Sequence, residues 1–227
     1  SLNIDHVYQV PHFVAPKETL SCMDYAQFAG GKGLNQSVAL ARAGVRTAHA
    51  GKIGADGAFL EETLKLAGVD TRFLIHGTLP TGHAIIQVDR EGQNCILLYP
   101  GANRAVAREE IDSVLDRLEP GTWILLQNEI NEIPYLMREA KARGFRIAIN
   151  PAPCGPEVSE YPLELADVLF VNEIEAAQLS GVNGMPDEIL DVLVKRFPEC
   201  EIVMTLGGDG AAYAKGAKRF RVASPEV

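Results

Sequence analysis

The feature that most restricts the fold of this sequence is an alternation of short apolar runs with helical patterns. The run Trp123 to Gln127 is compact and apolar, as expected of a buried parallel strand. A helical pattern follows at Pro134 to Arg143 and ends at Gly144, and the next apolar run is Phe145 to Ile149. Strands separated by helices indicate parallel β-α-β units, because a parallel strand needs a long return connection.

The alternation extends along most of the chain. Further strands are expected at Thr47 to Ile53, Val168 to Val171 and Ile202 to Leu206. Further helices are expected at Asn35 to Ala43, Gly57 to Ala67, Glu173 to Leu179 and Asp187 to Phe197. The predicted fold class is therefore α/β, with a mostly parallel central sheet covered by helices on both faces.

Two regions interrupt the alternation. Val7 to Phe28 is irregular, with prolines and short extended pieces, and Gly82 to Tyr99 has the pattern of a hairpin. We interpret these regions, at about residues 7–28 and 82–99, as one small sheet that projects as a lid from the α/β body. The predicted organisation is one domain over residues 1–227, incomplete at both ends.

The charge and cysteine pattern exclude several kinds of partner and site. A net charge of −9 argues against nucleic acid, because phosphate backbones recruit lysine and arginine. The four cysteines lie far apart and form no paired metal or redox motif, so we expect free thiols in a cytoplasmic protein. No apolar run is as long as a membrane span, so we expect no membrane partner.

Two motifs near the start of the chain suit a polyol. Asn3 and Asp5 are two residues apart on an extended segment, so their side chains point the same way and could bind vicinal hydroxyls. The alternative is an ordinary polar strand end. A glycine-rich segment, Gly30 to Gln36, runs directly into a helix and includes Gly31, Lys32, Gly33 and Asn35. The segment lacks the spacing of a P-loop or of a dinucleotide fingerprint. The alternative interpretation of the segment is a glycine turn with a solvated lysine.

Two later motifs follow predicted strands, where α/β folds place ligands. Asn172 and Glu175 come directly after one strand, and a carboxylate there can hold Mg²⁺ through water. The alternative is a helix start with favourable acids. A second loop could bind phosphate through its backbone N–H groups. The alternative interpretation of this loop is a simple turn. Its residues are Thr205, Leu206, Gly207, Gly208, Asp209 and Gly210.

In their order and spacing these motifs resemble the ribokinase, or phosphofructokinase-B, family of carbohydrate kinases. Three other segments resemble family motifs: Thr81-Gly82, Pro100 to Asn103 and Asn150 to Pro153. The resemblance covers essentially the whole chain. It implies a ribokinase-like three-layer α/β/α sandwich with a small β-sheet lid, through which two subunits pair as a homodimer.

The resemblance also implies roles for individual residues. The sugar would be bound by Asn3, Asp5, Gly31, Lys32, Gly33, Asn35 and Glu129. ATP would be bound by Asn172 and by the loop from Thr205 to Gly210, and Glu175 would act through Mg²⁺ and its waters. A monovalent cation such as K⁺ is a further candidate cofactor. The implied reaction transfers the γ-phosphate of ATP to a sugar hydroxymethyl group.

The family pattern also predicts residues outside this sequence. An apolar strand precedes the position of Asn3 in the family, and the catalytic aspartate, with its glycine-rich anion hole, is expected beyond Val227. We therefore expect the full protein to have roughly 300 residues. Among the substrates of the family, ribose is the one that we expect for this protein. The alternatives are a nucleoside or other sugar kinase and a catalytically inactive sugar sensor.

Overall fold

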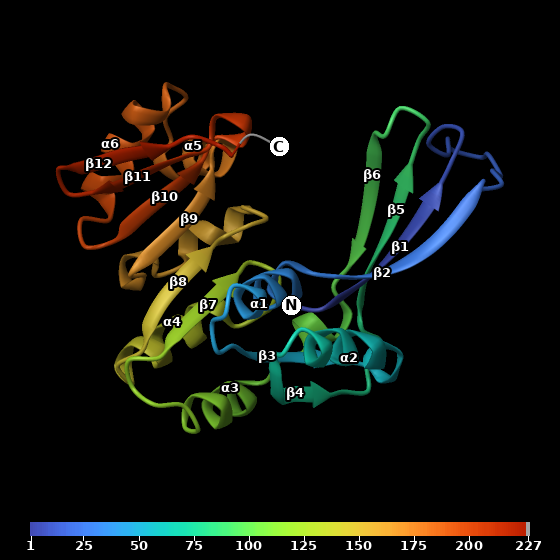
Figure 1. Ribbon diagram of the computed structural model, residues 1–227, viewed down its shortest axis with the longest axis horizontal. Coiled ribbons are helices and arrows are strands. Elements are labelled where there is room, and N and C mark those ends of the chain that lie inside the picture. The colour runs from blue at the N-terminus through green and yellow to red at the C-terminus, as the bar shows by residue number, and fades with distance from the viewer. Residues whose placement is uncertain (226–227) are drawn as a thin grey trace. The chain divides into compact units, whose positions relative to one another are not determined.

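The computed structural model describes residues 1–225, which divide into two compact units. The N-terminal unit comprises Ser1–Val106 and Glu129–Asn131, and the C-terminal unit comprises the rest of the chain (Figure 1). Each unit has its own sheets and helices and is described by itself. The single-domain organisation expected from the sequence stays a prediction.

The N-terminal unit carries a four-stranded sheet in the order β2-β1-β5-β6. Its strands are β1 (Asn3–Gln9), β2 (Asp24–Gly30), β5 (Gly82–Val88) and β6 (Asn94–Tyr99). β1 is antiparallel to β2 and parallel to β5, and β5 forms a hairpin with β6, as predicted. Figure 1 shows this sheet extending away from α2 and β4 of the same unit.

The expectation that Val7 to Phe28 is irregular is confirmed for residues 10–23, whereas the two ends of the region are regular paired strands. The last three residues of β1 and the first five of β2 form these ends, for example with Tyr8 paired to Tyr25. Apolar or aromatic side chains stand on both faces of these strands, for example Val7 and Tyr8 in succession. The period-two pattern that identifies a half-buried strand is therefore hidden.

The remaining elements of the N-terminal unit enclose its core. They are α1 (Lys32–Arg42), β3 (Ala48–Ile53), α2 (Ala58–Leu66) and β4 (Asp70–His76), with short 3₁₀ turns at Ala55–Gly57 and Gly101–Arg104. β3 and β4 pair in parallel. One cluster of its buried core residues comprises Leu2, Ile4, Leu34, Ile53, Leu60, Leu64 and Val69. Burying each leucine or isoleucine contributes about 1.5–3 kcal/mol, which anchors the start of β1 against α1.

The C-terminal unit is built on a six-stranded sheet in the order β12-β11-β10-β9-β8-β7. Its strands are β7 (Trp123–Gln127), β8 (Arg146–Asn150), β9 (Val168–Asn172), β10 (Glu201–Thr205), β11 (Ala211–Lys215) and β12 (Lys218–Val222). β7 to β10 are parallel, and β11 and β12 add antiparallel strands at one edge. The predicted parallel arrangement is therefore confirmed for four strands.

Four helices accompany this sheet. They are α3 (Arg108–Leu115), α4 (Ile133–Ala142), α5 (Glu173–Ser180) and α6 (Pro186–Arg196), with 3₁₀ turns at Pro156–Glu160, Leu163–Leu165 and Gly207–Asp209. The sequence predicted α4, α5 and α6 to within one residue at each end but missed α3, β4, β11 and β12. Among residues 1–225, no helix is both long enough and apolar enough to cross a membrane.

Candidate functional site

The predicted sugar-binding residues all lie in the N-terminal unit. Asn3 and Asp5 occupy one face of β1, and Asn3 pairs in register with Gly30 of β2. A Cβ atom on Gly30 would lie 2.1 Å from Asp5 Oδ2, so only glycine lets the carboxylate occupy this place. The Asp5 carboxylate accepts no hydrogen bond from residues 1–225, and it is only partly buried. Asp5 therefore has no visible structural partner.

The surroundings of Asp5 raise the pKa of its carboxyl above the ordinary value. Burial raises the pKa of the Asp5 carboxyl, and the nearby negative charge of Glu129 raises it further. His6 and Lys32 act in the opposite direction without cancelling these effects. Asp5 and Glu129 are therefore close enough to interact, although they are far apart in the sequence.

Glu129 joins Ser1 and Lys32 through three hydrogen bonds. Its Oε1 lies 2.8 Å from Lys32 Nζ, and its Oε2 accepts hydrogen bonds from Lys32 N at 2.8 Å and Ser1 Oγ at 2.5 Å. The carboxylate side chain is 8% exposed, whereas that of Lys32 is 41% exposed. Burial alone would raise the pKa of Glu129, but these hydrogen bonds and the lysine charge hold it below its usual value. Glu129 is therefore a buried carboxylate that stays ionised.

The same contacts explain why α1 begins at Lys32 and not at Asn35 as predicted. Gly31 is the residue before the helix and has φ of 94°, a conformation that favours glycine. Gly33 N donates to Ser1 Oγ, and Leu34 N donates to the Ser1 carbonyl, each at 3.0 Å. Groups from distant segments thus satisfy N–H donors that the local sequence cannot satisfy.

The structure brings six of the seven predicted sugar-binding residues into one connected cluster. These are Asn3, Asp5, Gly31, Lys32, Gly33 and Glu129. The seventh, Asn35, lies in the first turn of α1, where it is exposed and its side chain makes no hydrogen bond within residues 1–225. Whether these residues bind sugar stays a prediction.

Two residues of this cluster were not predicted. Ser1 binds Glu129 through its hydroxyl group, and the buried Asn103 binds both Leu2 and Asn3. Ser1 directly precedes the Asn3–Asp5 motif, and Asn103 ends the segment Pro100 to Asn103 that resembles the family. Both were visible as parts of motifs, but contacts across about a hundred residues leave no trace in the sequence.

The predicted nucleotide-binding residues all lie in the C-terminal unit. Asn172 and Thr205 are register partners at the carboxyl ends of the parallel strands β9 and β10. Asn172 also begins α5, where its Oδ1 accepts from Glu175 N at 2.8 Å. Glu175 Oε2 in turn accepts from Asn172 N at 3.0 Å, which completes a capping box. The helix-start role considered for these residues is therefore present, and it leaves Glu175 Oε1 without a partner in the capping box.

The loop after β10 has two backbone N–H groups, those of Gly207 and Gly208, that make no hydrogen bond within residues 1–225. The 3₁₀ turn Gly207–Asp209 is closed by hydrogen bonds from Asp209 N to Leu206 O and from Gly210 N to Gly207 O. A Cβ atom on Gly208 would meet nothing within 4 Å, and its φ lies outside the range that favours glycine. Packing within the described chain therefore does not require glycine at 208. Open space beside backbone donors suits an anion such as phosphate.

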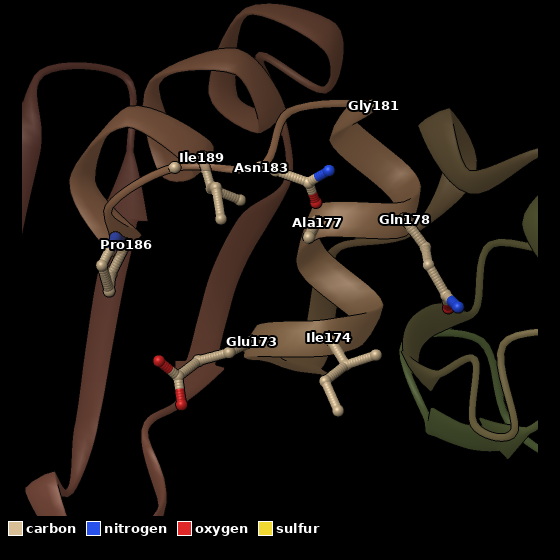
Figure 2. Close-up of a pocket in the computed structure, with 9 residues that line it drawn as sticks. Glu173, Ile174, Ala177, Gln178, Gly181, Asn183, Pro186 and Ile189 are labelled. Carbon is tan, nitrogen blue, oxygen red and sulfur yellow. The ribbon is translucent and has the colours of Figure 1, made fainter.

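A cavity of the C-terminal unit lies elsewhere. It has a volume of about 600 Å³ and lies between α5 and α6 (Figure 2). Its lining includes Glu173, Ile174, Gln178, Asn183 and Ile189. None of the residues predicted to bind ATP or Mg²⁺ contributes to it.

Comparison with known proteins decides the family. Residues 1–227 match the family described as pfkB family carbohydrate kinase. The chain belongs to this family. A ribokinase from Staphylococcus aureus is 34% identical over 224 residues, which are 94% of this chain and 73% of the relative. The chain thus spans about three quarters of that relative's length.

Solved structures confirm the predicted fold of this pfkB-family chain. A ribokinase from Thermotoga maritima superposes with a TM-score of 0.88 and 30% identity, covering 100% of this chain and 76% of that one. The ribokinase of Arabidopsis thaliana, solved with ribose and ATP, gives a TM-score of 0.83 at 25% identity, covering 98% and 75%. The ribokinase-like α/β/α fold expected from the sequence is therefore shown.

Proposed function

We propose that this pfkB-family protein is an ATP-dependent kinase that phosphorylates the hydroxymethyl group of ribose. The observation that carries the proposal is the cluster of Asn3, Asp5, Lys32 and Glu129, which combines two carboxylates with an amide and an ammonium group. Such groups match the dense hydroxyls of a small sugar. The similarity to ribokinases, one of them solved with ribose and ATP, supports this choice.

In this proposal the two units supply different parts of the reaction. The N-terminal unit binds and orients the sugar, with Asp5 and Glu129 accepting from hydroxyls and Lys32 holding Glu129 in place. The C-terminal unit binds ATP through Asn172 and the loop from Thr205 to Gly210, where the N–H groups of Gly207 and Gly208 are available to donate to phosphate oxygens. Phosphoryl transfer depends mainly on this positioning and on charge stabilisation.

Glu175 fits the requirements of a Mg²⁺ ligand acting through water. Its side chain is 8% exposed, and one carboxylate oxygen stays outside the capping box. Mg²⁺ in kinases is usually held by one or two carboxylates, substrate phosphates and several waters. When bound, the ion would neutralise charge on the phosphates. Glu175 would keep it in place, and K⁺ remains a second candidate cofactor.

Glu175→Gln is expected to lower kcat of the full-length protein and to shift the Mg²⁺ dependence to higher concentration. The amide oxygen of glutamine can still accept from Asn172 N, so the helix start and the melting temperature should be preserved. Ribose affinity should stay near the wild-type value. Steady-state kinetics over a Mg²⁺ series measures both effects.

Glu175→Ala is the matched comparison because it also removes the capping box. We expect a further loss of stability of about 0.5–2 kcal/mol in this variant. If Glu175→Gln keeps the wild-type kcat and Mg²⁺ response while Glu175→Ala is destabilised, Glu175 only starts the helix.

The proposed function is tested by ADP release from the full-length protein across a panel of sugars and nucleosides. Ribose should give the highest kcat/KM. Higher activity with a nucleoside or another sugar would favour the nearest alternative, a different kinase of the same family. Ribose binding without any ADP release would favour the inactive sensor.

The free thiols of Cys22, Cys95, Cys154 and Cys200 support the further proposal of a cytoplasmic location.

We also propose that the protein is a homodimer through the sheet of β1, β2, β5 and β6. Every residue of β6 is exposed, including Ile96, Leu97 and Leu98, and β6 is an edge strand. An exposed apolar edge of this kind is unfavourable unless another chain covers it. Light scattering of the full-length protein should give a dimer, and Leu97→Glu should shift it toward monomer. A fully active wild-type monomer at micromolar concentration would contradict the proposal.

A further inference from the structure

Asn103 is a buried side chain whose orientation can be deduced from its partners. It is 1% exposed and contacts the backbone of Leu2 at both ends of its amide. Its Oδ1 accepts from Leu2 N at 3.0 Å, and its Nδ2 donates to Leu2 O at 2.9 Å. A backbone N–H group only donates and a carbonyl only accepts, so these bonds fix which end of the amide is nitrogen.

The orientation of Asn103 determines that of Asn3. Asn103 Nδ2 also donates to Asn3 Oδ1 at 2.8 Å, so the oxygen of the Asn3 amide is occupied. Asn3 Nδ2 has no hydrogen bond to residues 1–225. Asn3 is 5% exposed, yet the only fully buried unpaired side-chain nitrogen or oxygen among these residues is His49 Nε2. Asn3 Nδ2 therefore remains accessible from solvent as an unused donor.

The packing around the two amides leaves them little room to rearrange. Gly82 pairs in register with Asn3 on the neighbouring strand β5. A Cβ atom on Gly82 would lie 2.2 Å from Asn103 Nδ2 and 2.4 Å from Asn3 Oδ1. The pair can form only because residue 82 has no side chain, so the strand approaches the amides as closely as backbone allows.

We propose that Asn103 is a positioning residue that makes Asn3 a fixed hydrogen-bond donor toward the sugar, beside the acceptor Asp5. The proposal rests on the proposed sugar-binding function. In this proposal one sugar hydroxyl contacts both residues: it donates its single proton to ionised Asp5 and so offers a lone pair to Asn3. The pair therefore selects a group that donates and accepts at once. It disfavours an ether, which has no proton, and an ammonium group, which has no lone pair.

A double-mutant cycle on the full-length protein tests this proposal. Ribose affinity is measured by calorimetric titration for Asn3→Ala, Asn103→Ala and the double variant, with affinity for an ATP analogue as the control. We expect each single substitution to weaken ribose binding about tenfold. The ribose affinity of the double variant should not fall below that of the single variant with the lower affinity. ATP-analogue affinity should not change. Losses that multiply in the double variant, or wild-type ribose affinity in Asn103→Ala, would overturn the proposal.

Asn3→Asp keeps the test decisive if Asn103→Ala does not fold. Aspartate still offers an oxygen to Asn103 Nδ2, but it turns the donor that faces the sugar into an acceptor. At a pH where the new carboxyl is ionised, ribose affinity should then fall at least as far as in Asn3→Ala, and wild-type affinity would overturn the proposal; the added charge at a position that is 5% exposed should also lower the melting temperature. A wild-type protein that does not bind ribose refutes the proposed function. Normal ribose binding by Asn3→Ala refutes only the role of Asn3 and Asn103.

Discussion

Asp5→Ala in the full-length protein is expected to weaken ribose binding by roughly tens- to thousands-fold. The Asp5 carboxylate has no hydrogen-bond partner in the described chain, so its acceptor oxygens are free for two adjacent hydroxyls. Each hydrogen bond to a charged group contributes about 1.5–3 kcal/mol, and every 1.4 kcal/mol is about tenfold in affinity. Calorimetric titration with ribose and, separately, with an ATP analogue measures the effect.

The control for this experiment is Asp24→Ala. Asp24 is an exposed aspartate on β2 of the same sheet, and its replacement should leave ribose affinity unchanged. Affinity for the ATP analogue should be unchanged in both variants. Equal losses for both ligands, or an Asp5→Ala variant that binds ribose normally, would count against the assignment.

The raised pKa of Asp5 gives the same experiment two further readouts. Only the ionised carboxylate accepts from two hydroxyls, so ribose affinity should fall as pH falls through a pKa above the ordinary value of 3.8. A carboxyl whose pKa is raised on folding favours the folded state at low pH and loses that contribution as pH rises. At neutral pH the charged Asp5 therefore costs stability, and Asp5→Ala should not lower the melting temperature.

Glu129→Gln is expected to lower the free energy of unfolding by about 1.5–3 kcal/mol at neutral pH and to weaken ribose binding. The substitution removes the charge from a carboxylate that is 8% exposed and is bonded to Lys32 and Ser1. Because Lys32 is 41% exposed, water can solvate its freed ammonium group, which keeps the loss below that of a fully buried pair. Chemical denaturation measures the change.

The pH dependence of this loss follows from the lowered pKa of Glu129. Its contribution to stability is complete above the ordinary value of 4.5 and is lost as pH falls through the lower pKa of the folded state. The gap between wild type and Glu129→Gln should therefore close in acid. Glu132→Gln is the control, because the Arg108–Glu132 pair is more exposed and should contribute only about 0–1 kcal/mol. A gap that persists unchanged at low pH would show that charge is not its cause.

Strands that form local β-α-β units could be predicted from the sequence. Trp123–Gln127 was found at its exact bounds, because a short apolar run between polar turns is typical of a buried strand. The lid strands β1 and β2 could not be recognised as regular. Their residues face different surroundings on each side, so hydrophobic periodicity carries little information.

The candidate site could be predicted as far as its motifs extend. Asn3, Asp5, Lys32 and Glu129 all belong to segments that the sequence marks, and the structure connects them. The orientation of Asn3 could not be predicted, because it depends on Asn103. A hydrogen bond between residues 100 positions apart leaves no periodic signal in either segment.

The start of α1 has a consequence for how this region becomes ordered. Its first N–H groups are satisfied by Ser1 and Glu129, and the bond that joins those two residues spans 128 positions. Closing such a loop costs conformational entropy before the stabilising contacts form, so this helix start should form late in folding. Hydrogen exchange at Lys32 would then report the docking of Glu129, and exchange at Gly33 the docking of Ser1, since the helix itself cannot protect these two amides.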